Sequence, residues 1–385
     1  MTKPTVLVLG GLGFIGRNFI PYLVENELAS EIRVVDKVLL VTTALNPRQK
    51  EAFSKVEVWQ RDLVDRRKSC FFRYSLKMLI YSVIKLSIEN SFTRTDGGSF
   101  DYVFNLAAET KYSQIEKVYE ERVYTLSVRN AEEAARRNVK AYVEVSTAEI
   151  YQSDKALAEI DLYDKNPSKE DDKAKPWTML NLVILRPTIV YGPGATMGLT
   201  PRIVCGRIYK LLDEEMKVLW SKDLKINTVH VYDVVRALWH VATWYQNNGK
   251  AGKGPYIYNL ADLGNTDQER INKHLSNIFG IKTGFHGAIT SNLAQLNLDS
   301  AVEDSNDKHM GPWTTFIRDS KKIKNTPLTP YVDKELLCNN PLSVDGTKIT
   351  VETGFQYEVP EITDEKLVEM IEDFKVIGWW PKENV

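Results

Sequence analysis

The stretch VLVLGGLGFIGRNFIPYL, at residues 6–23, restricts the fold of this chain more than any other part of it. An aliphatic run leads into a turn, and a segment with the apolar spacing of a helix follows. Four glycines satisfy both GxGxxG and GxxGxxG, and they are Gly10, Gly11, Gly13 and Gly16. Glycine permits a tight turn, a close approach of the backbone to a pyrophosphate, and close packing of helix on sheet. We therefore expect a phosphate-binding turn, with the N–H groups at Phe14 and Ile15 facing the phosphates.

An acidic residue stands where such a site needs one. Asp36 ends the next β-rich run, twenty residues after Gly16. Its carboxylate would accept hydrogen bonds from the ribose hydroxyls of adenosine and would repel a 2′-phosphate. NAD is therefore the expected cofactor, and the adjacent Lys37 weakens that preference without reversing it.

Short apolar runs alternate with helical patterns through the first half of the chain, which is typical of βαβ units. The expected strands are Thr5–Gly10, Ile32–Asp36, Val56–Gln60, Asp101–Ala108, Ala141–Thr147 and Asn181–Pro187. The predicted fold is α/β, a Rossmann-type doubly wound parallel sheet with a smaller C-terminal substrate lobe. We place the NAD-binding domain at 1–195, with an insertion at 66–92, and a mixed α/β substrate-binding lobe with a C-terminal helix at 196–385.

The second half has a looser pattern. Helices are expected at 201–215 and 231–246, after Thr266, and within 363–377, where Gly378 and Pro381 follow the last turn. A strand is expected at 256–262. The polar stretch Thr283–Lys308 has no clear period, and we expect an irregular loop there.

A basic and apolar segment, Arg66–Asn90, interrupts the βαβ rhythm. Arg73, Lys77 and Lys85 fall on one helical face, between apolar residues. One interpretation is an amphipathic helix for a membrane surface or a partner. The alternatives are an extended crossover helix with a solvated basic edge, or sequence of no functional value.

Charge and cysteine usage exclude several classes of function. Lys plus Arg (50) balance Asp plus Glu (51), so no global field attracts nucleic acid, and a small-molecule substrate is expected. Cys70, Cys205 and Cys338 are far apart and form no metal-ligand motif. We see no signal sequence and no apolar run near the ~20 residues of an integral membrane segment. A cytoplasmic location follows as the expectation.

Several motifs in order make the chain similar to the extended short-chain dehydrogenase/reductase superfamily, and within it to the NAD-dependent epimerase/dehydratase family. They are GGLGFIG, Asp36, RDL at 61–63, NLAAET at 105–110, VSTAEIY at 145–151, LRPTIVYGPG at 185–194 and TVHVYDVVRAL at 228–238. The resemblance implies that Asp62 and Leu63 lie at the adenine. It also implies that Leu106, Ala107 and Ala108 pass beside the cofactor phosphates and ribose, and that the segment from Pro187 caps the nicotinamide end. Homodimers that form through helices of the main domain are common in this family, so the resemblance makes a homodimer an expectation.

Family chemistry transfers a hydride between substrate and nicotinamide, while a tyrosine assisted by a lysine four residues later moves the hydroxyl proton. Thr147 matches the residue that holds the substrate oxygen, and Ser146 is a weaker candidate. Sugar-nucleotide dehydratases carry Asp-Glu next, whereas this chain has Ala148 and Glu149, which disfavours dehydration. Lys225 would replace only loosely the arginine that holds a diphosphate in the epimerases. A sugar nucleotide, a sterol-like or flavonoid-like molecule, or another alcohol or ketone therefore stays open as the substrate.

The tyrosine–lysine pair is expected on a helix before LRPTIVYGPG, yet only three residues separate Thr178 from Leu182. Three other tyrosines are weak alternatives: Tyr151 with Lys155, Tyr81 with Lys85, and Tyr163 without a matching lysine. We interpret the gap as a segment lost after Thr178, through alternative splicing or an imperfect gene model. Two hypotheses follow: an NAD-dependent oxidoreductase or epimerase-like enzyme, or a catalytically impaired NAD-binding protein.

Overall fold

The computed structural model describes residues 2–64, 87–152, 180–249 and 255–382. By contacts the chain divides into two units, each described here by itself. The first unit comprises Met1–Arg186, Val235–Tyr258 and Val351–Phe355, and the second comprises Pro187–Val234, Asn259–Thr350 and Gln356–Val385. The boundary placed at residue 195 from the sequence stays a prediction.

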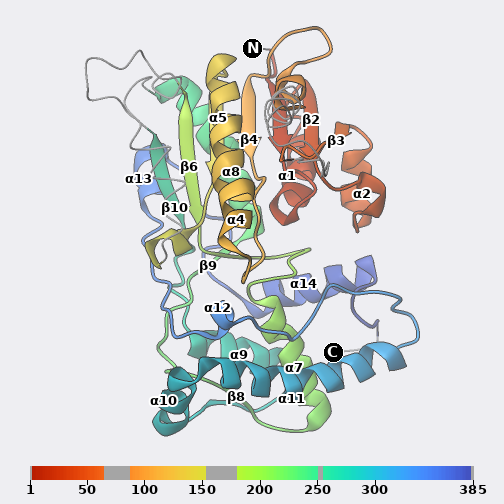
Figure 1. Ribbon diagram of the computed structural model, residues 1–385, viewed down its shortest axis with the longest axis vertical. Coiled ribbons are helices and arrows are strands. Elements are labelled where there is room, and N and C mark those ends of the chain that lie inside the picture. Colours follow the sequence, from red (N-terminus) through yellow and green to blue (C-terminus); the bar gives the residue numbers. More distant parts are fainter. Residues whose placement is uncertain (1, 65–86, 153–179, 250–254, 383–385) are drawn as a thin grey trace, which may run out of the picture. The chain divides into compact units, whose positions relative to one another are not determined.

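A seven-stranded sheet forms the centre of the first unit, in the order β10-β6-β5-β4-β1-β2-β3 (Figure 1). The strands are β1 (Thr5–Leu9), β2 (Glu31–Asp36), β3 (Glu57–Gln60), β4 (Tyr102–Asn105), β5 (Ala141–Val145), β6 (Leu182–Pro187) and β10 (Tyr256–Leu260). Pairing is parallel from β3 through β6. This strand order and parallel pairing confirm the predicted Rossmann-type α/β fold. The physical cause is that aliphatic runs buried on both faces favour a parallel sheet.

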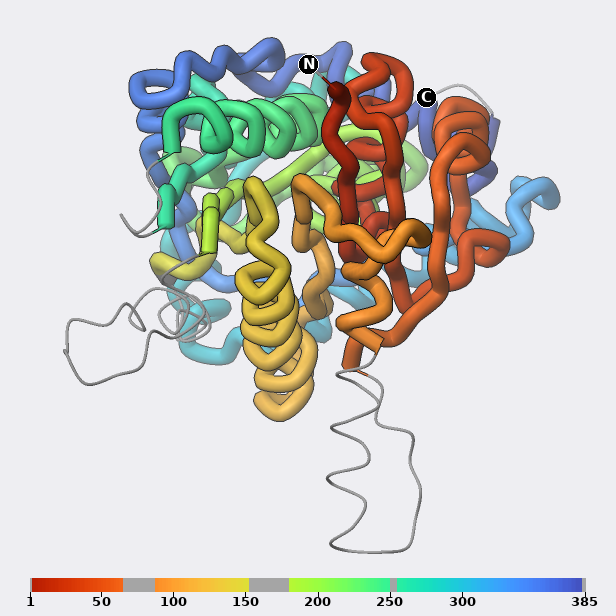
Figure 2. Tube along the Cα trace, turned by 90° about the horizontal axis from the view of Figure 1, so that it is seen from above, coloured from red at the N-terminus to blue at the C-terminus, as the bar shows by residue number. Residues whose placement is uncertain are grey.

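Helices cover both faces of this sheet, as Figures 1 and 2 show. The helical elements are α1 (Phe14–Glu25), η1 (Leu40–Thr42), α2 (Pro47–Phe53), α4 (Glu116–Tyr119), the π-helix η2 (Glu120–Thr125), α5 (Leu126–Arg136), η3 (Ala148–Gln152), α8 (Val231–Asn248) and α13 (Lys348–Thr353). On β4, Phe104 packs against Phe19 of α1, and Tyr102 packs against Trp239 of α8. Val103, between them, belongs to the core on the other face with Leu126 of α5. Because successive side chains of a strand point to opposite faces of the sheet, α1 and α8 lie on one face of the sheet and α5 lies on the other.

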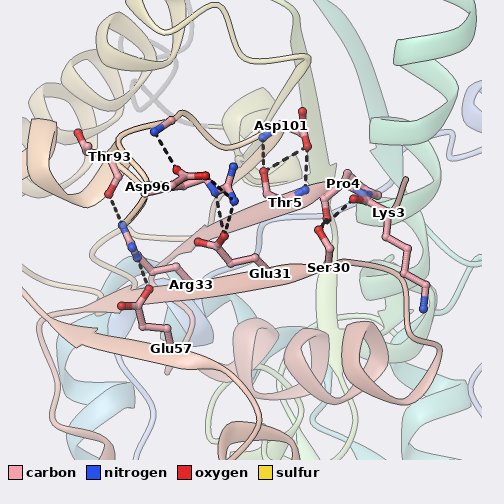
Figure 3. Close-up of polar contacts among 12 residues, drawn as sticks. Lys3, Pro4, Thr5, Ser30, Glu31, Arg33, Glu57, Thr93, Asp96 and Asp101 are labelled. Atoms are coloured by element: carbon pink, nitrogen blue, oxygen red, sulfur yellow. Dashed lines mark hydrogen bonds and ion pairs between the residues drawn. The ribbon is translucent and has the colours of Figure 1, made fainter. Parts of the chain in front are cut away.

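A polar cluster joins the amino ends of the strands (Figure 3). The Arg33 guanidinium of β2 is fully buried, pairs with Glu57 at 2.6 Å, and donates to the carbonyl oxygen of Thr93. Arg94 pairs with Glu31 in the same cluster. These bonds fix the segment that leads into β4, next to residues 87–92, which are helical.

The second unit contains most of the remaining elements. Its helices are α7 (Thr200–Leu212), α9 (Gln268–Phe279), α10 (Ala288–Leu296), α11 (Leu298–Asp319), α12 (Lys334–Leu337) and α14 (Asp364–Ile377). Two parallel strand pairs accompany them: β7 (Ile189–Tyr191) with β9 (Thr228–His230), and β8 (Met216–Val218) with β11 (Thr283–Phe285). The last helix ends at Gly378 in the left-handed conformation, as the sequence predicts.

The predicted loop at Thr283–Lys308 is wrong, because β11, α10 and the first half of α11 occupy it. The Asn297 side chain caps α11 by accepting from the Ser300 N–H. Asn306 and Trp313, further along α11, are buried and donate to backbone carbonyl groups outside the helix. Polar and aromatic tertiary contacts hold this helix, so it lacks the apolar period on which the prediction relied.

The described ranges hold no helix that is both long and apolar enough to cross a membrane.

Candidate cofactor site

The glycine turn after β1 is tightly packed, and its role in binding phosphates stays a prediction. Gly10 has a positive φ of +74°, and a Cβ atom on it would lie 2.7 Å from the backbone of Ala107. A Cβ atom on Gly16 would lie 2.5 Å from the Cα atom of Gly11. A side chain at either position would force the backbone apart. Gly10 is therefore required by its conformation and by the lack of space, and Gly16 by the lack of space.

Helix α1 begins at this turn without a side-chain cap. Its N-cap residue is Gly13, which has no side chain that could accept from the first-turn N–H groups. The first turn has no acidic residue, Gly13 is exposed, and Phe14 and Ile15 are partly exposed. These features make the start of α1 suited to bind the phosphates of a dinucleotide.

The carboxylate of Asp36 is buried beside the same turn. Its Oδ2 atom accepts from the Leu12 N–H and its Oδ1 atom accepts from the Val38 N–H, each at 2.9 Å. Each carboxylate oxygen keeps lone-pair capacity for a ribose hydroxyl. Asp36 is therefore held in place by backbone N–H groups from two segments, and its role toward an adenosine ribose stays a prediction.

The other predicted cofactor residues follow neighbouring strands at the same carboxyl edge. Leu106 continues from β4 by donating to the Leu9 carbonyl oxygen at 2.9 Å. Ala107 and Ala108, partly exposed and exposed, come directly after it. Asp62, beyond β3, is exposed, whereas the Leu63 side chain belongs to the core. The roles assigned to these residues, and to the exposed Lys37, stay predictions.

A buried polar network beneath this edge was missed by the sequence analysis. The Glu144 carboxylate of β5 accepts from Asn105 Nδ2, from the Ser127 hydroxyl at 2.8 Å and from the Tyr142 hydroxyl at 3.0 Å. Asn105 in turn accepts from the Ala107 N–H at 3.3 Å. The network therefore fixes the turn that follows β4. The signal was a charged residue inside the apolar run AYVEV.

The candidates for substrate chemistry lie just after β5. Thr147 is partly exposed, and its Oγ1 accepts from the Glu149 N–H at 3.2 Å, which leaves the hydroxyl hydrogen for a substrate oxygen. Ser146 is also partly exposed, and its N–H is bonded to β6. Tyr151 lies in η3, is exposed, and accepts from Arg186 Nη1 at 2.8 Å.

Several predicted positions lie outside the described residues. They are Lys155, Tyr163 and Thr178 in the tyrosine–lysine search, Cys70, and Arg73, Lys77, Tyr81 and Lys85 in the insertion.

Pro187 ends β6 and is assigned to the second unit. Lys225, in that unit, pairs with Asp267 at 3.3 Å. Within the part of the chain that the structure describes, no cluster of three or more His, Cys, Asp or Glu side chains could hold a metal ion.

A parallel sheet with a glycine turn after β1 and a buried acid at the end of β2 defines the class of dinucleotide-binding Rossmann proteins. Within this class, the chain belongs to the NAD dependent epimerase/dehydratase family, whose profile matches residues 6–261. The predicted family is thereby confirmed. Because the family depends on NAD, the predicted cofactor is confirmed as well.

Individual relatives are distant. An uncharacterised protein of Schizosaccharomyces pombe is 22% identical over 267 residues, covering 61% of this chain and 69% of the relative. MoeE5 in complex with UDP-glucose and NAD is a similar solved structure, with a TM-score of 0.56, 18% identity, and coverage of 96% of this chain and 98% of that one. UDP-glucose 4-epimerase of Thermotoga maritima, with UDP-glucose, has a TM-score of 0.55, 18% identity, and coverage of 96% and 98%. Pal from Bacillus thuringiensis has a TM-score of 0.60, 15% identity, and coverage of 96% and 99%. These likenesses show a shared fold.

Proposed function

We propose that this chain is an NAD-dependent oxidoreductase or epimerase-like enzyme acting on a hydroxyl or keto group of a sugar nucleotide. The observation that carries the proposal is the dinucleotide cradle, in which the glycine turn, the uncapped start of α1 and the buried Asp36 adjoin one another. Sugar nucleotides are favoured because the similar structures include MoeE5 with UDP-glucose and a UDP-glucose 4-epimerase. Lys225, the candidate for holding a diphosphate, is paired with Asp267 and so gives the sugar nucleotide no further support. A sterol-like substrate is therefore included as a second arm of the test.

When bound, NAD accepts or supplies a hydride at a substrate carbon. The N–H groups at the start of α1 bind its pyrophosphate, and Asp36 accepts from its adenosine ribose. Thr147 donates its hydroxyl hydrogen to the substrate oxygen and so orients the carbon that reacts. Among the described residues, Tyr151 is the tyrosine nearest in sequence to Thr147, and we assign it as the candidate for moving the hydroxyl proton.

The cofactor part of the proposal is tested by Gly13→Ala. A Cβ atom on Gly13 would meet only the Gly10 carbonyl oxygen, at 3.2 Å, so the fold should tolerate it. The same methyl group would occupy the path of the pyrophosphate, and NAD affinity should fall about tenfold or more, equivalent to about 1.4 kcal/mol.

Gly287→Ala is the matched control, because Gly287 is also the N-cap of a helix and a Cβ atom there has nothing within 4 Å. Binding is measured by isothermal titration calorimetry with NAD. Equal affinities for the two variants would contradict the proposed position of the cofactor.

A second candidate function is that of an NAD-binding protein without turnover. The observation that favours it is the position of Tyr151, in a short 3-10 helix with its hydroxyl bonded to Arg186, while no other Tyr-x-x-x-Lys follows β5 in the sequence. Both candidate functions use the same proposed cofactor residues.

Turnover separates the two candidates. Purified protein is incubated with NAD and UDP-glucose, UDP-N-acetylglucosamine, a 3-hydroxysterol or a simple alcohol, and NADH absorbance and epimerised product are followed. Turnover that Thr147→Ala abolishes and Thr147→Ser retains would support the enzyme, because serine keeps the hydroxyl. NAD binding with no turnover on any substrate would support the second candidate.

We also propose a cytoplasmic location and a homodimer. The near balance of charged residues and the widely spaced cysteines support the first, and the family resemblance supports the second. Fractionation of cells that express the tagged chain, and light scattering of the purified protein, test them. Recovery in a membrane fraction or a monomer mass would contradict them.

A further inference from the structure

An ion pair crosses the carboxyl end of β1. Lys37 follows β2 directly, and Glu109 comes four residues after the end of β4. In the sheet, β1 lies between these two strands. The Lys37 Nζ atom nevertheless lies 4.0 Å from the Glu109 Oε2 atom. The pair therefore spans the place where the glycine turn leaves β1.

Glu109 is the fixed member of this pair. Its side chain is only 10% exposed, its Oε2 atom accepts from Arg122 Nη1 at 3.1 Å, and its Oε1 atom accepts from the Lys111 N–H at 3.3 Å. Burial alone would raise the pKa of Glu109, but these bonds and the Lys37 and Arg122 charges lower it, so the carboxylate is ionised at neutral pH. Lys37 is 51% exposed and has a flexible stem. When the pair opens, Lys37 is the member that moves.

The position of Lys37 matters because it is the cation nearest in sequence to Asp36. A cation beside the adenosine ribose accommodates the 2′-phosphate of NADP, whereas an acid there selects the 2′-hydroxyl of NAD. A lysine held by a carboxylate offers a phosphate less attraction than a free one, because a phosphate must compete with the existing partner.

We propose that Glu109 is a specificity-determining residue, which holds Lys37 across the glycine turn and thereby keeps the site selective for NAD over NADP. The inference rests on the proposed function, since it requires NAD in this cradle. It assigns the selectivity to two acids: Asp36 disfavours the 2′-phosphate directly, and Glu109 withholds the lysine that would attract it.

The test compares dissociation constants for NAD and NADP in the wild type, Glu109→Gln, Lys37→Gln and the double variant. Glu109→Gln should lower the ratio of the NADP constant to the NAD constant about two- to fivefold, the range expected for a partly exposed ion pair. Lys37→Gln alone should change the ratio little, because its charge is already engaged. In the Glu109→Gln background, Lys37→Gln should restore the wild-type ratio. Added salt should diminish the differences.

Glu116→Gln is the matched control, because it removes an equal charge from an exposed residue of the neighbouring α4. The inference would be overturned if Glu109→Gln left the ratio of the two dissociation constants unchanged. It would also be overturned if Glu116→Gln changed that ratio as much as Glu109→Gln does, or if Glu109→Gln had the same effect in the Lys37→Gln background. If Glu109→Gln fails to fold, the exposed Lys37→Gln decides alone: a large rise in its NADP to NAD ratio would show that Lys37 already serves NADP. A wild type that binds NAD tightly with an unchanged Glu109→Gln ratio refutes this inference only. A wild type that binds no NAD refutes the proposed function.

Discussion

Glu57→Ala should destabilise the first unit by about 2–3 kcal/mol. The Arg33 guanidinium is 0% exposed and the Glu57 side chain is 37% exposed, and their atoms are 2.6 Å apart. Removing one member of a fully buried pair costs about 3–5 kcal/mol, because the other charge stays buried without compensation. An exposed pair contributes about 0–1 kcal/mol. A pair with one buried and one partly exposed member should lie between these limits.

The assay is native-state hydrogen exchange of the β2 and β3 amides, which reports the free energy of opening where the pair lies. The control is Glu27→Ala, because the Lys3–Glu27 pair is 49% and 81% exposed and its loss should cost less than about 1 kcal/mol. Both variants remove one glutamate from an ion pair, but Glu57→Ala also removes the acceptor of the Trp59 Nε1–H bond at 2.8 Å, so a double-mutant cycle is needed to isolate the Arg33–Glu57 pair.

The cycle is completed by Arg33→Met and by the double variant. Methionine removes the buried charge, so Glu57→Ala should cost less in that background, by at least about 1 kcal/mol. If Glu57→Ala costs no more than Glu27→Ala, or if the two effects at Arg33 and Glu57 simply add, then the reasoning from burial is refuted.

Two further predictions concern the second unit. Burial raises the pKa of Asp262 to about 6 against the hydrogen bond from the Thr228 hydroxyl, which lowers it. The folded protein then binds this proton more tightly than the unfolded chain, whose aspartates have a pKa of about 3.9. The free energy of unfolding of the wild type should therefore decrease as the pH rises from about 4 to about 6. Asp262→Asn should lack this fall, and urea midpoints across that range check it. Gly206→Ala should cost about 1–3 kcal/mol, because its Cβ atom would lie 2.6 Å from the Phe279 ring, whereas Gly311→Ala, with nothing within 4 Å, should stabilise α11 by up to ~1 kcal/mol. Thermal unfolding of both variants shows whether the signs differ as expected.

The strands and the glycine turn were predictable because their causes are local. Buried aliphatic runs and glycines at fixed spacing determine β1, the turn and the start of α1 without reference to distant residues. Helix α11 was not predictable in this way, since its buried Asn306 and Trp313 bond to segments that only the tertiary fold brings near.

The site divides along the same line. Asp36 could be found from its place at the end of β2 and its spacing from Gly16, although one of its two partners, the Leu12 N–H, lies 24 residues earlier in the chain. The Glu144 network and the Lys37–Glu109 pair join segments that are far apart in the sequence, and no short motif predicts such contacts. A lone charge in an apolar strand is the one trace that Glu144 leaves in the sequence.

The glycine turn has a consequence for the speed of cofactor exchange. The bonds that shape it, from Gly13 to Gly10, from Leu12 to Asp36 and from Leu106 to Leu9, all lie within the chain. A binding site that its own hydrogen bonds hold in shape needs little ordering when a ligand binds. Differences in NAD affinity between variants should therefore arise mainly from the dissociation rate. Substitutions that loosen the turn should therefore shorten the residence time of NAD while its association rate changes little. A turn that formed only on contact with the ligand would slow association instead.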